Sequence, residues 1–365
     1  MDIWRDKRLV LTLDAGRTNF VFSAVKGGKE IVKPITTPSN ADKRDLCLPG
    51  IIDGFERILK SVKEKPAAIS FAFPGPADYK HGIIGDLAHF PAFRGGVALG
   101  PMLEAHFQIP VFINNDGDLF AYGEALGGVL PAINRRLEEA QNPKRYKNLI
   151  GLTLGTGFGG GWVHDGTLFV GDNSIATEVW LMSTRLFPDR FAEEGISARA
   201  IQRVFLERAS KDYAKDISPK AIYDIAADSD NPDRDAARLA FAQFGRCLGD
   251  SLANLLTIAD GIAVMGGGLT GAREWYMPAL MRELHAQCYA ADGKALPRLV
   301  QRVYDIDDTD QFREFVTDRS KAIPIPGTDR TVRYDPEPVL AVCSSKLGAS
   351  KAIGVGAYAF ALKHI

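Results

Sequence analysis

The chain contains few cysteines and no long apolar run. Its four cysteines are far apart and form no CxxC pair, so neither a zinc knuckle nor a disulfide framework is encoded (Cys47, Cys247, Cys288, Cys343). No apolar run in the sequence approaches the length of a signal-peptide core or a membrane span. The 44 Lys and Arg residues are scattered among 45 Asp and Glu, without the basic stripe of a nucleic-acid binder. We expect a cytoplasmic protein whose partner is a small molecule, with no membrane or nucleic-acid partner.

The sequence contains an internal repeat. With 365 residues, 46% of them apolar, the chain is long enough to form two hydrophobic cores. The segment LTLDAG at residues 11–16 recurs as LTLGTG at residues 152–157, and each copy precedes a second apolar run and a turn. Chance similarity between two glycine-containing hairpins is the alternative. We interpret the repeat as a duplicated α/β domain.

Strand and helix patterns alternate along the chain. The first half predicts a helix over residues 45–63, a buried strand over 67–73, a helix over 101–107, a strand over 111–115 and a helix that begins near Asp118. The second half predicts a long amphipathic helix over residues 235–257, a strand at 261–265 and a helix of small residues at 354–362. Residues 296–337 are rich in Asp, Arg and Pro and predict an extended excursion with some strand. The overall pattern is that of an α/β protein.

The tip of the first repeat carries a candidate phosphate site. Gly16 allows close approach of an anion, and Thr18 offers a hydroxyl and an N–H. Asp14 would repel phosphate directly, but its carboxylate suits Mg²⁺ or the water around it. The alternative is a plain hairpin turn with a solvated Asp.

The second repeat has five glycines within residues 155–161, in a GxGxxG pattern. A dinucleotide-binding fingerprint must open a helix, whereas this segment opens a strand, and the P-loop ending is missing. We prefer a loop whose N–H groups surround the phosphates of a nucleotide over a purely structural turn. The glycines at 266–268, between a strand and a helix, would form another wall of the same site.

Asp116 is the candidate catalytic base. It follows a strand, at the end where α/β proteins place ligands, and Asp118 is the better candidate for the helix N-cap. A capping role for Asp116 is the alternative. Phosphoryl transfer needs a carboxylate that accepts a hydroxyl proton. Glu178 and the pair Glu193 and Glu194 are candidate sugar ligands, or solvated helix residues.

In this order, the segments resemble the repressor/open-reading-frame/kinase (ROK) family of sugar kinases, which is related to hexokinase and bacterial glucokinase. The resemblance covers nearly the whole chain and rests on seven segments: LTLDAGRTN, FAFPGPAD, FPAFRG, VFINNDGDLFAYGEALGG, LTLGTGFGGGWVHDG, ADGIAVMGGGL and LGASKAIGVGAYAFAL.

The resemblance implies a fold and a set of site residues. The fold would be the duplicated ribonuclease H-like fold of actin and hexokinase, with residues 1–120 plus 350–365 in the smaller lobe and 121–349 in the larger. Asp116 would be the catalytic base. The sugar would contact Asn115, Glu178, Glu193, Gly75 and His89. ATP and Mg²⁺ would contact Asp14, Gly16, Thr18, Thr156, Gly157, Gly159, Gly267 and Gly268. A homodimer is also implied.

Three departures from the family pattern affect these expectations. The Cys-rich zinc motif and its sugar-binding His are missing, Leu181 stands in the His position, and we expect no structural zinc. Arg17 replaces a usual Gly, and His89 replaces a usual sugar-binding Asn. No helix-turn-helix precedes Asp14, which argues against the DNA-binding branch of the family.

Two classes of function remain open. An ATP-dependent hexose kinase, for glucose or a close relative, is favoured by Asp116, which a mere binder would not need. The missing zinc motif leaves open a regulatory protein that binds sugar or nucleotide without catalysis. An N-acetylhexosamine or fructose kinase and a sugar-independent ATPase are further alternatives.

Overall fold

The computed structural model describes residues 2–75, 77–88 and 90–365, which form two compact α/β units. Unit 1 comprises Met1–Pro131, Gly160–Thr177 and Ser345–Ile365, and unit 2 comprises Ala132–Gly159 and Glu178–Ser344. Residues 1–120 and 350–365, which the sequence places in one lobe, fall in unit 1. Unit 1 also includes residues 121–131 and 160–177.

Unit 1 contains a mixed sheet with the strand order β3-β2-β1-β5-β8. Strands β1, β5 and β8 are parallel neighbours, while β2 is antiparallel to β1. The strands are β1 (Val10–Ala15), β2 (Asn19–Lys26), β3 (Lys29–Glu30), β4 (Ile35–Pro38), β5 (Ala68–Ala72), β6 (Ile83–Ile84), β7 (Val97–Ala98), β8 (Val111–Asn114) and β11 (Thr167–Phe169). The helices are α1 (Arg44–Ser61), α2 (Leu99–Phe107), α3 (Asp116–Leu126) and α10 (Ala349–His364).

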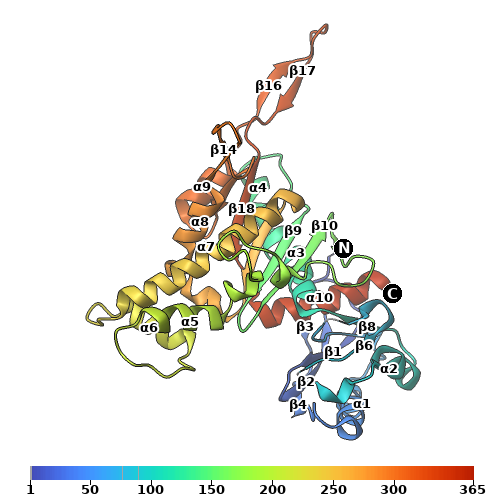
Figure 1. Cartoon of the computed structure of the whole chain (residues 1–365). Coiled ribbons are helices and arrows are strands. Elements are labelled where there is room, and N and C mark those ends of the chain that lie inside the picture. Colours follow the sequence, from blue (N-terminus) through green and yellow to red (C-terminus); the bar gives the residue numbers. More distant parts are fainter. Residues whose placement is uncertain (1, 76, 89) are drawn as a thin grey trace. The chain divides into compact units, whose positions relative to one another are not determined.

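Helices cover both faces of this sheet. Alternate strand residues such as Leu11 and Phe71 pack against Phe55 of α1 in the main core, and Ala72 points to the other face, against Leu119 and Ala357. Figure 1 shows the blue strands with α1 and α2 on one side and α10 on the other. The predicted helices over 45–63 and 101–107 are confirmed as α1 and α2.

Small residues in α10 permit close packing of two helices. A side chain at Gly356 would run into the Leu119 carbonyl oxygen of α3, and one at Gly123 would run into the Ala352 carbonyl oxygen. The glycine and alanine content of the last helix therefore serves helix packing as well as packing on the sheet.

Unit 2 repeats the parallel part of this arrangement. Its parallel strands run in the order β9-β12-β18-β15, and β12 lies between β9 and β18 as β5 lies between β1 and β8. The strands are β9 (Leu149–Leu154), β12 (Ile262–Gly266), β13 (Gln287–Tyr289), β14 (Ala295–Pro297), β15 (Arg302–Asp305), β16 (Lys321–Pro324), β17 (Thr331–Tyr334) and β18 (Val339–Ser344). The helices are α5 (Ala198–Arg208), α6 (Pro219–Ala227), α7 (Arg234–Ala259), α8 (Arg273–Leu284) and α9 (Thr309–Val316).

Two elements cross the border between the units, α4 (Val129–Glu139) and β10 (Phe158–His164). The chain enters β10 directly after the glycine-rich loop, so the prediction that this loop opens a strand is confirmed. The strand expected within residues 296–337 is confirmed, but the segment is not wholly an excursion, because β15 within it pairs with β18 as part of the central sheet of unit 2. The last three residues of this strand, Arg302–Asp305, are buried. The charged residues around the strand made it difficult to recognise in the sequence.

Candidate active site

The ends of three parallel strands bring together the predicted residues of unit 1. In the strand register, Asp14 of β1 lies opposite Ala72 of β5, and Ala72 lies opposite Asn114 of β8. Asn115 and Asp116 follow β8 directly. Side chains that follow neighbouring parallel strands converge at one edge of a sheet, which is where α/β proteins bind ligands.

The start of α3 differs from the sequence prediction. The helix begins at Asp116, and its N-cap is Asn115, whose side-chain oxygen accepts a hydrogen bond from the Gly117 N–H at 2.7 Å. The assignment of the cap to Asp118 was wrong, because Asn115 already has the extended backbone and the acceptor that a cap requires. Asp118 is buried inside the first turn. Asp116 is therefore the first helical residue and not the cap.

The Asp116 carboxylate is in an environment that disfavours its charge. Asp116 is exposed at the surface of the fold, yet the protein atoms packed near its carboxylate partly desolvate it, and this desolvation is the main cause that raises its pKa above the ordinary value of 3.8. The Gly117 N–H, which donates to Oδ1 at 2.9 Å, opposes the shift. The negative charge of Asp14 adds to it. Such a carboxylate is suited to accept a proton near neutral pH.

Asn115 and Gly75 lie beside a residue that the sequence did not single out. The Tyr79 hydroxyl donates to the Phe73 carbonyl at 2.9 Å and lies 3.5 Å from Nδ2 of Asn115. A side chain at Gly75 would run into this hydroxyl. Tyr79 therefore fixes the space between the turn after β5 and the predicted sugar ligand Asn115.

The tip of the first hairpin is open to solvent. Asp14 and Thr18 are exposed, and the Thr18 carbonyl accepts the Ser39 N–H at 3.0 Å. Arg17, whose role was open, pairs with Asp42 at 2.9 Å through two exposed side chains. The Arg17 guanidinium therefore lies beside Asp42, two residues before the start of α1.

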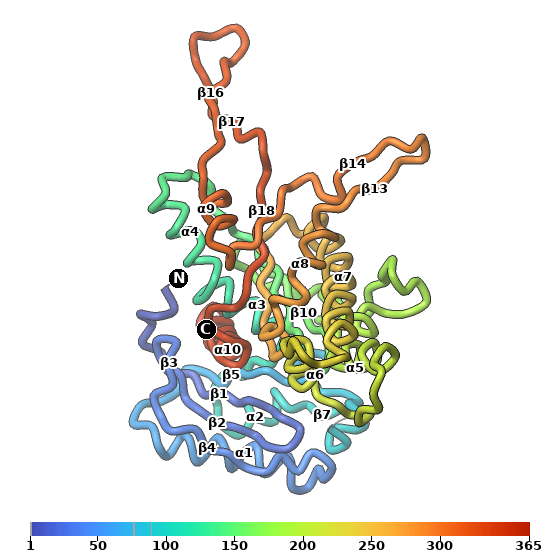
Figure 2. The backbone as a smooth tube through the Cα atoms, turned by 90° about the vertical axis from the view of Figure 1, so that its left-hand side faces the viewer, coloured from blue at the N-terminus to red at the C-terminus, as the bar shows by residue number. Residues whose placement is uncertain are grey.

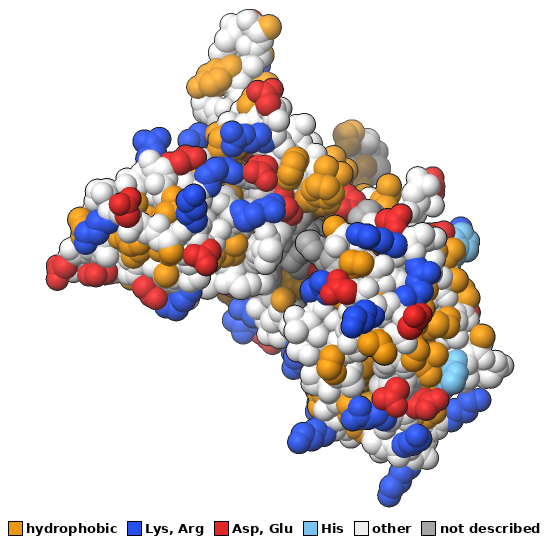
Figure 3. Space-filling view, turned by 60° about the horizontal axis from the view of Figure 1, so that its bottom comes forward, with side chains coloured by type: hydrophobic (Ala, Val, Ile, Leu, Met, Phe, Trp, Pro, Cys, Tyr) orange, Lys and Arg blue, Asp and Glu red, His pale blue; other side chains and the backbone are white. Residues whose placement is uncertain are grey.

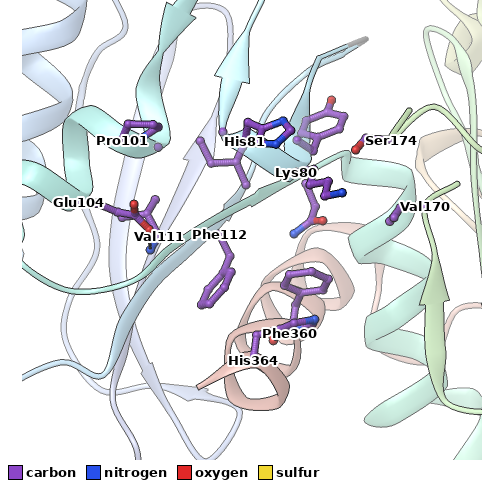
Figure 4. A pocket seen from close by; sticks show the side chains of 15 residues that line it. Lys80, His81, Pro101, Glu104, Val111, Phe112, Val170, Ser174, Phe360 and His364 are labelled. Carbon is purple, nitrogen blue, oxygen red and sulfur yellow. Dashed lines mark hydrogen bonds between the residues drawn. The ribbon is translucent and has the colours of Figure 1, made fainter. Parts of the chain in front are cut away.

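The described residues of unit 1 line at least two cavities. One, of about 560 Å³, lies beside Asp14 between β1, β2 and the first turns of α10, and the buried Ser23 hydroxyl in its wall has no hydrogen-bond partner among the described residues. The other, of about 360 Å³, is lined by Lys80, Phe112 and Phe360 (Figure 4). Neither Asn115 nor Asp116 lines the second cavity, so we do not assign it to the predicted sugar site.

The nucleotide loops of unit 2 also follow neighbouring parallel strands. Residues 155–159 come after β9 and residues 267–268 after β12, and Thr153 pairs in register with Gly266. Thr156 and Gly268 are exposed, and residues 155–157 form a tight turn in which the Gly155 N–H donates to the Gly157 carbonyl at 3.1 Å. The two glycine-rich loops singled out from the sequence in this unit therefore lie together.

Gly267 can be distinguished experimentally from its neighbour. It has φ of 97°, and a side chain there would run into the Leu154 carbonyl oxygen, whereas Gly268 faces open space. We expect Gly267→Ala to lower the free energy of unfolding by about 1–3 kcal/mol, measured by denaturant titration. Gly268→Ala should leave this free energy nearly unchanged. Equal losses in both variants would contradict the structural reason.

The two candidate sugar carboxylates lie on adjoining turns. Glu178 precedes the turn Val179–Leu181 and accepts a hydrogen bond from the Trp180 indole N–H, while Glu193 lies in the turn Ala192–Glu194. The Ala192 N–H donates to the Met182 carbonyl at 2.8 Å, which joins the two turns. The segment therefore presents both carboxylates from one local structure.

Glu193 also contacts the glycine-rich loop. Its Oε2 accepts the Phe158 N–H at 3.0 Å and would lie 2.7 Å from a side chain added at Gly157, and its Oε1 pairs with Arg199 at 2.8 Å. No local sequence pattern predicts the contacts to Phe158 and Arg199. Glu193 is thus placed to hold the loop in addition to its predicted sugar contact.

This double contact predicts a difference between two variants. Glu193→Gln keeps an oxygen that can accept the Phe158 N–H, while Glu193→Ala leaves that N–H without its partner. We expect the Ala variant to raise the KM for ATP several-fold more than the Gln variant, as measured by steady-state kinetics at saturating sugar. If both variants have the same KM for ATP, Glu193 does not position the loop.

A buried carboxylate anchors the segment that carries these residues. Asp250, which is fully buried in α7, accepts the Arg185 backbone N–H at 2.9 Å and the Arg185 guanidinium at 2.7 Å. Arg298, itself largely buried, donates to the same carboxylate at 2.8 Å. Residues 182–195, which stand in place of the zinc motif of the family, are therefore held by ion pairs in this chain.

The part of the chain that the structure describes, residues 2–75, 77–88 and 90–365, bears on three of the expectations. No group of three or more His, Cys, Asp or Glu side chains there is arranged to hold a metal ion. The helices of that part include none that is both long and apolar enough to cross a membrane. Three of its four cysteines, Cys47, Cys247 and Cys343, are buried. The predicted sugar ligand His89 lies outside the described residues.

Comparison with known proteins decides the family. The sequence pattern of the ROK family matches residues 10–305. The chain belongs to the ROK family. This ROK protein is 51% identical to glucokinase from Parabacteroides distasonis ATCC 8503, whose crystal structure matches it with a TM-score of 0.92 over 100% of both chains.

Two further relatives of this ROK protein are sugar kinases. Glucokinase from Thermotoga maritima is 24% identical over 73% of this chain and 84% of the relative. N-acetyl-D-glucosamine kinase from Vibrio parahaemolyticus is 30% identical over 46% of this chain and 50% of the relative. The predicted fold, the two-domain α/β fold of actin and hexokinase, is confirmed by these similarities and by the repeated strand order.

Proposed function

We propose that this ROK protein is an ATP-dependent kinase that phosphorylates a hydroxyl of a hexose, with glucose or a close relative as the first candidate. Asp116 carries the proposal. It is a carboxylate with a raised pKa, it is free of the capping duty that Asn115 performs, and it follows β8 at the edge where Asp14 lies near the end of β1. The 51% identity to a glucokinase supports the choice of sugar.

In this proposal Asp116 accepts the proton of the attacking sugar hydroxyl. Asn115, Gly75 and Glu178 orient the sugar, and Glu193 adds a contact next to the glycine-rich loop. His89 is retained as a proposed sugar contact on the resemblance alone. Orientation matters because a reacting hydroxyl must be aligned with the phosphorus before transfer.

The residues present fit a magnesium nucleotide. Asp14 is an exposed carboxylate whose charge acts on Asp116, and oxygen donors of this kind suit Mg²⁺, directly or through water. Gly16 and Thr18 of the first hairpin, together with Thr156, Gly157, Gly159, Gly267 and Gly268 of unit 2, are proposed to contact the nucleotide. Bound Mg²⁺ would neutralise phosphate charge.

A coupled assay of ADP release over a hexose panel tests the proposal. We expect turnover with glucose or a close relative, at least tenfold above the sugar-free ATPase rate of the same preparation. Folded protein that shows no turnover with any hexose or N-acetylhexosamine would favour the regulatory alternative. Equal rates with and without sugar would indicate an ATPase.

N-acetylhexosamine kinase is the second candidate function. The 30% sequence identity to N-acetyl-D-glucosamine kinase over part of the chain favours this candidate. His89 stands where the family usually has an Asn that contacts the sugar, so this position does not favour glucose over N-acetylglucosamine. The ratio of kcat/KM for glucose and N-acetylglucosamine separates the two candidates. Fructose belongs in the same panel.

The raised pKa of Asp116 predicts the acid limb of the rate profile. A general base must be deprotonated, so kcat/KM should fall as the pH drops through the folded-state pKa, which lies above 3.8. Asp14→Asn removes a negative charge that raises this pKa, so it should move the limb to lower pH. The profile is measured over a pH range in which circular dichroism shows the protein folded. A limb at or below 3.8, or no shift in the variant, would contradict the assignment.

Several further properties belong to the same proposal. We propose a cytoplasmic homodimer without structural zinc and without a nucleic-acid partner. Figure 3 shows one face of the molecule, on which Lys and Arg side chains are interspersed with Asp and Glu. This mixture on the visible face supports a small-molecule partner, because nucleic acid binding needs a cationic field.

A further inference from the structure

The cavity of about 360 Å³ in unit 1 lies between the helical turn Tyr79–His81, α2, β8 and the last turns of α10. Figure 1 and Figure 2 both show the red helix α10 against the sheet of this unit. All of the residues that line the cavity belong to unit 1. Its volume is in the range of pockets that hold small molecules. Because Asn115 and Asp116 are not in its wall, a ligand here would occupy a different space from the sugar of the proposed reaction.

The wall of the cavity contains a buried hydrogen-bond donor without a partner. Asn114, the last residue of β8, is only 4% exposed, and its Nδ2 has no hydrogen-bond partner among the described residues. Such buried groups are rare, because a donor that has left water without finding an acceptor costs free energy. Asn114 also lines this cavity. Its amide therefore marks a point at which the occupant of the cavity can accept a hydrogen bond.

The two ends of the cavity carry opposite charges. Figure 4 shows Glu104 beside Val111 at one end, and Lys80 toward Ser174 at the other. One carboxylate oxygen of Glu104 accepts the Val111 N–H at 3.1 Å, which holds the carboxylate at its end. A ligand that fits both ends has hydroxyl groups to donate to Glu104 and a negative charge for Lys80.

Aromatic rings form one side of the cavity between these ends. The ring centroids of Phe112 in β8 and Phe360 in α10 lie 5.8 Å apart, and the His364 ring stacks on Phe360 at 4.1 Å. Figure 4 shows these three rings on the same side of the cavity. Aromatic faces pack against the C–H groups of a small ring, while polar groups at the edges fix its orientation.

We propose that this cavity is a second ligand site, separate from the proposed active site, and that it binds a phosphorylated hexose. The Lys80 ammonium and the Asn114 amide donate to phosphate oxygens, and Glu104 accepts from hydroxyl groups of the sugar. The rings of Phe112 and Phe360 cover the C–H groups between them. A neutral hexose would leave Lys80 without a counter-charge. Inorganic phosphate would leave Glu104 and the rings without contacts.

Calorimetric titration of glucose 6-phosphate into the full-length protein tests the assignment. We expect the wild type to bind it with a Kd below about 1 mM. Glu178→Ala, which impairs the proposed active site, should leave this Kd within threefold. Lys80→Glu reverses the charge at the phosphate end of the cavity and should raise the Kd at least tenfold in either background. Asn114→Leu removes the buried donor and should raise it at least threefold. Lys60→Glu, at an exposed lysine of α1, is the matched control and should keep the Kd within twofold.

The same titration with fructose 6-phosphate, glucose and inorganic phosphate defines the class of ligand. Binding of either hexose phosphate as described supports the proposal, and the tighter of the two distinguishes the product of glucose phosphorylation from a hexose phosphate made elsewhere. Glucose or inorganic phosphate bound as tightly as both hexose phosphates would overturn the assigned class.

Two further outcomes would overturn the site itself. One is the absence of binding by both hexose phosphates, which would leave the cavity to water. The other is binding that Glu178→Ala abolishes and Lys80→Glu does not change, since this pattern belongs to the proposed active site. Circular dichroism confirms that the variants are folded, and Lys80 is exposed, so its substitution removes no core contact. Binding is measured without turnover, so failure of this test is distinct from failure of the hexose assay.

Discussion

Replacement of Asp116 by Asn should reduce sugar-dependent turnover by about 10²- to 10⁴-fold. The amide cannot accept the hydroxyl proton at neutral pH, but it retains an oxygen for the Gly117 N–H that Asp116 now accepts. Because desolvation makes the charged form of Asp116 unfavourable, its removal should not lower the free energy of unfolding. The measurements are kcat by ADP release and unfolding by denaturant titration.

Asp53→Asn is a matched control for loss of one negative charge in unit 1. Asp53 is an exposed residue of α1 with a distant partner, Arg57 at 3.7 Å. Its substitution should leave kcat within twofold. Sugar affinity of the Asp116→Asn variant, measured by calorimetry, should remain close to that of the wild type, because Asn115 and Glu178 are still present. A variant that keeps more than a tenth of the wild-type kcat would refute Asp116 as the base.

Asp250→Ala should destabilise the protein by about 3 kcal/mol. The substitution leaves the Arg298 guanidinium buried without its carboxylate and frees the Arg185 backbone N–H. Part of the loss is offset because Asn254 also accepts a hydrogen bond from Arg298 at 3.1 Å. Since Arg185 belongs to the segment that carries Glu178 and Glu193, the KM for sugar should rise as well.

Two further variants isolate the role of the buried charge. Asp250→Asn keeps an acceptor for the Arg185 N–H, so it should lose less stability than the Ala variant. Asp235→Ala removes an exposed carboxylate from the same helix, and it should change the free energy of unfolding by less than about 0.5 kcal/mol. Stability losses of equal size in all three variants would show that the ion pairs do not anchor the segment.

Local patterns in the sequence were sufficient for the elements and for the location of the loops. The helices α1 and α2 and the strand before Asp116 follow from apolar periodicity, and the glycine-rich loop opens a strand as its following residues indicate. The start of α3 was missed by two residues because Asn115 and Asp118 are both good capping residues in sequence. Only the backbone conformation distinguishes them.

Contacts between distant segments could not be predicted in the same way. Asp250 resembles any other polar residue of an amphipathic helix in the sequence, yet it is paired with Arg185, 65 positions away, and Arg298, 48 positions away. The same is true of Glu193 and the Phe158 N–H. Strand Arg302–Asp305 was hidden within a charged stretch because its burial depends on pairing with β18.

The sequence by itself determined the duplicated α/β organisation, the family and the carboxylate expected to act as base, because these depend on short motifs and on residue order. The tertiary structure decided which residue caps α3, what raises the pKa of Asp116 and what anchors residues 182–195. Burial, desolvation and ion pairing arise between atoms that the chain brings together only when it folds. The alternation of residues along one strand does not show whether another element covers it.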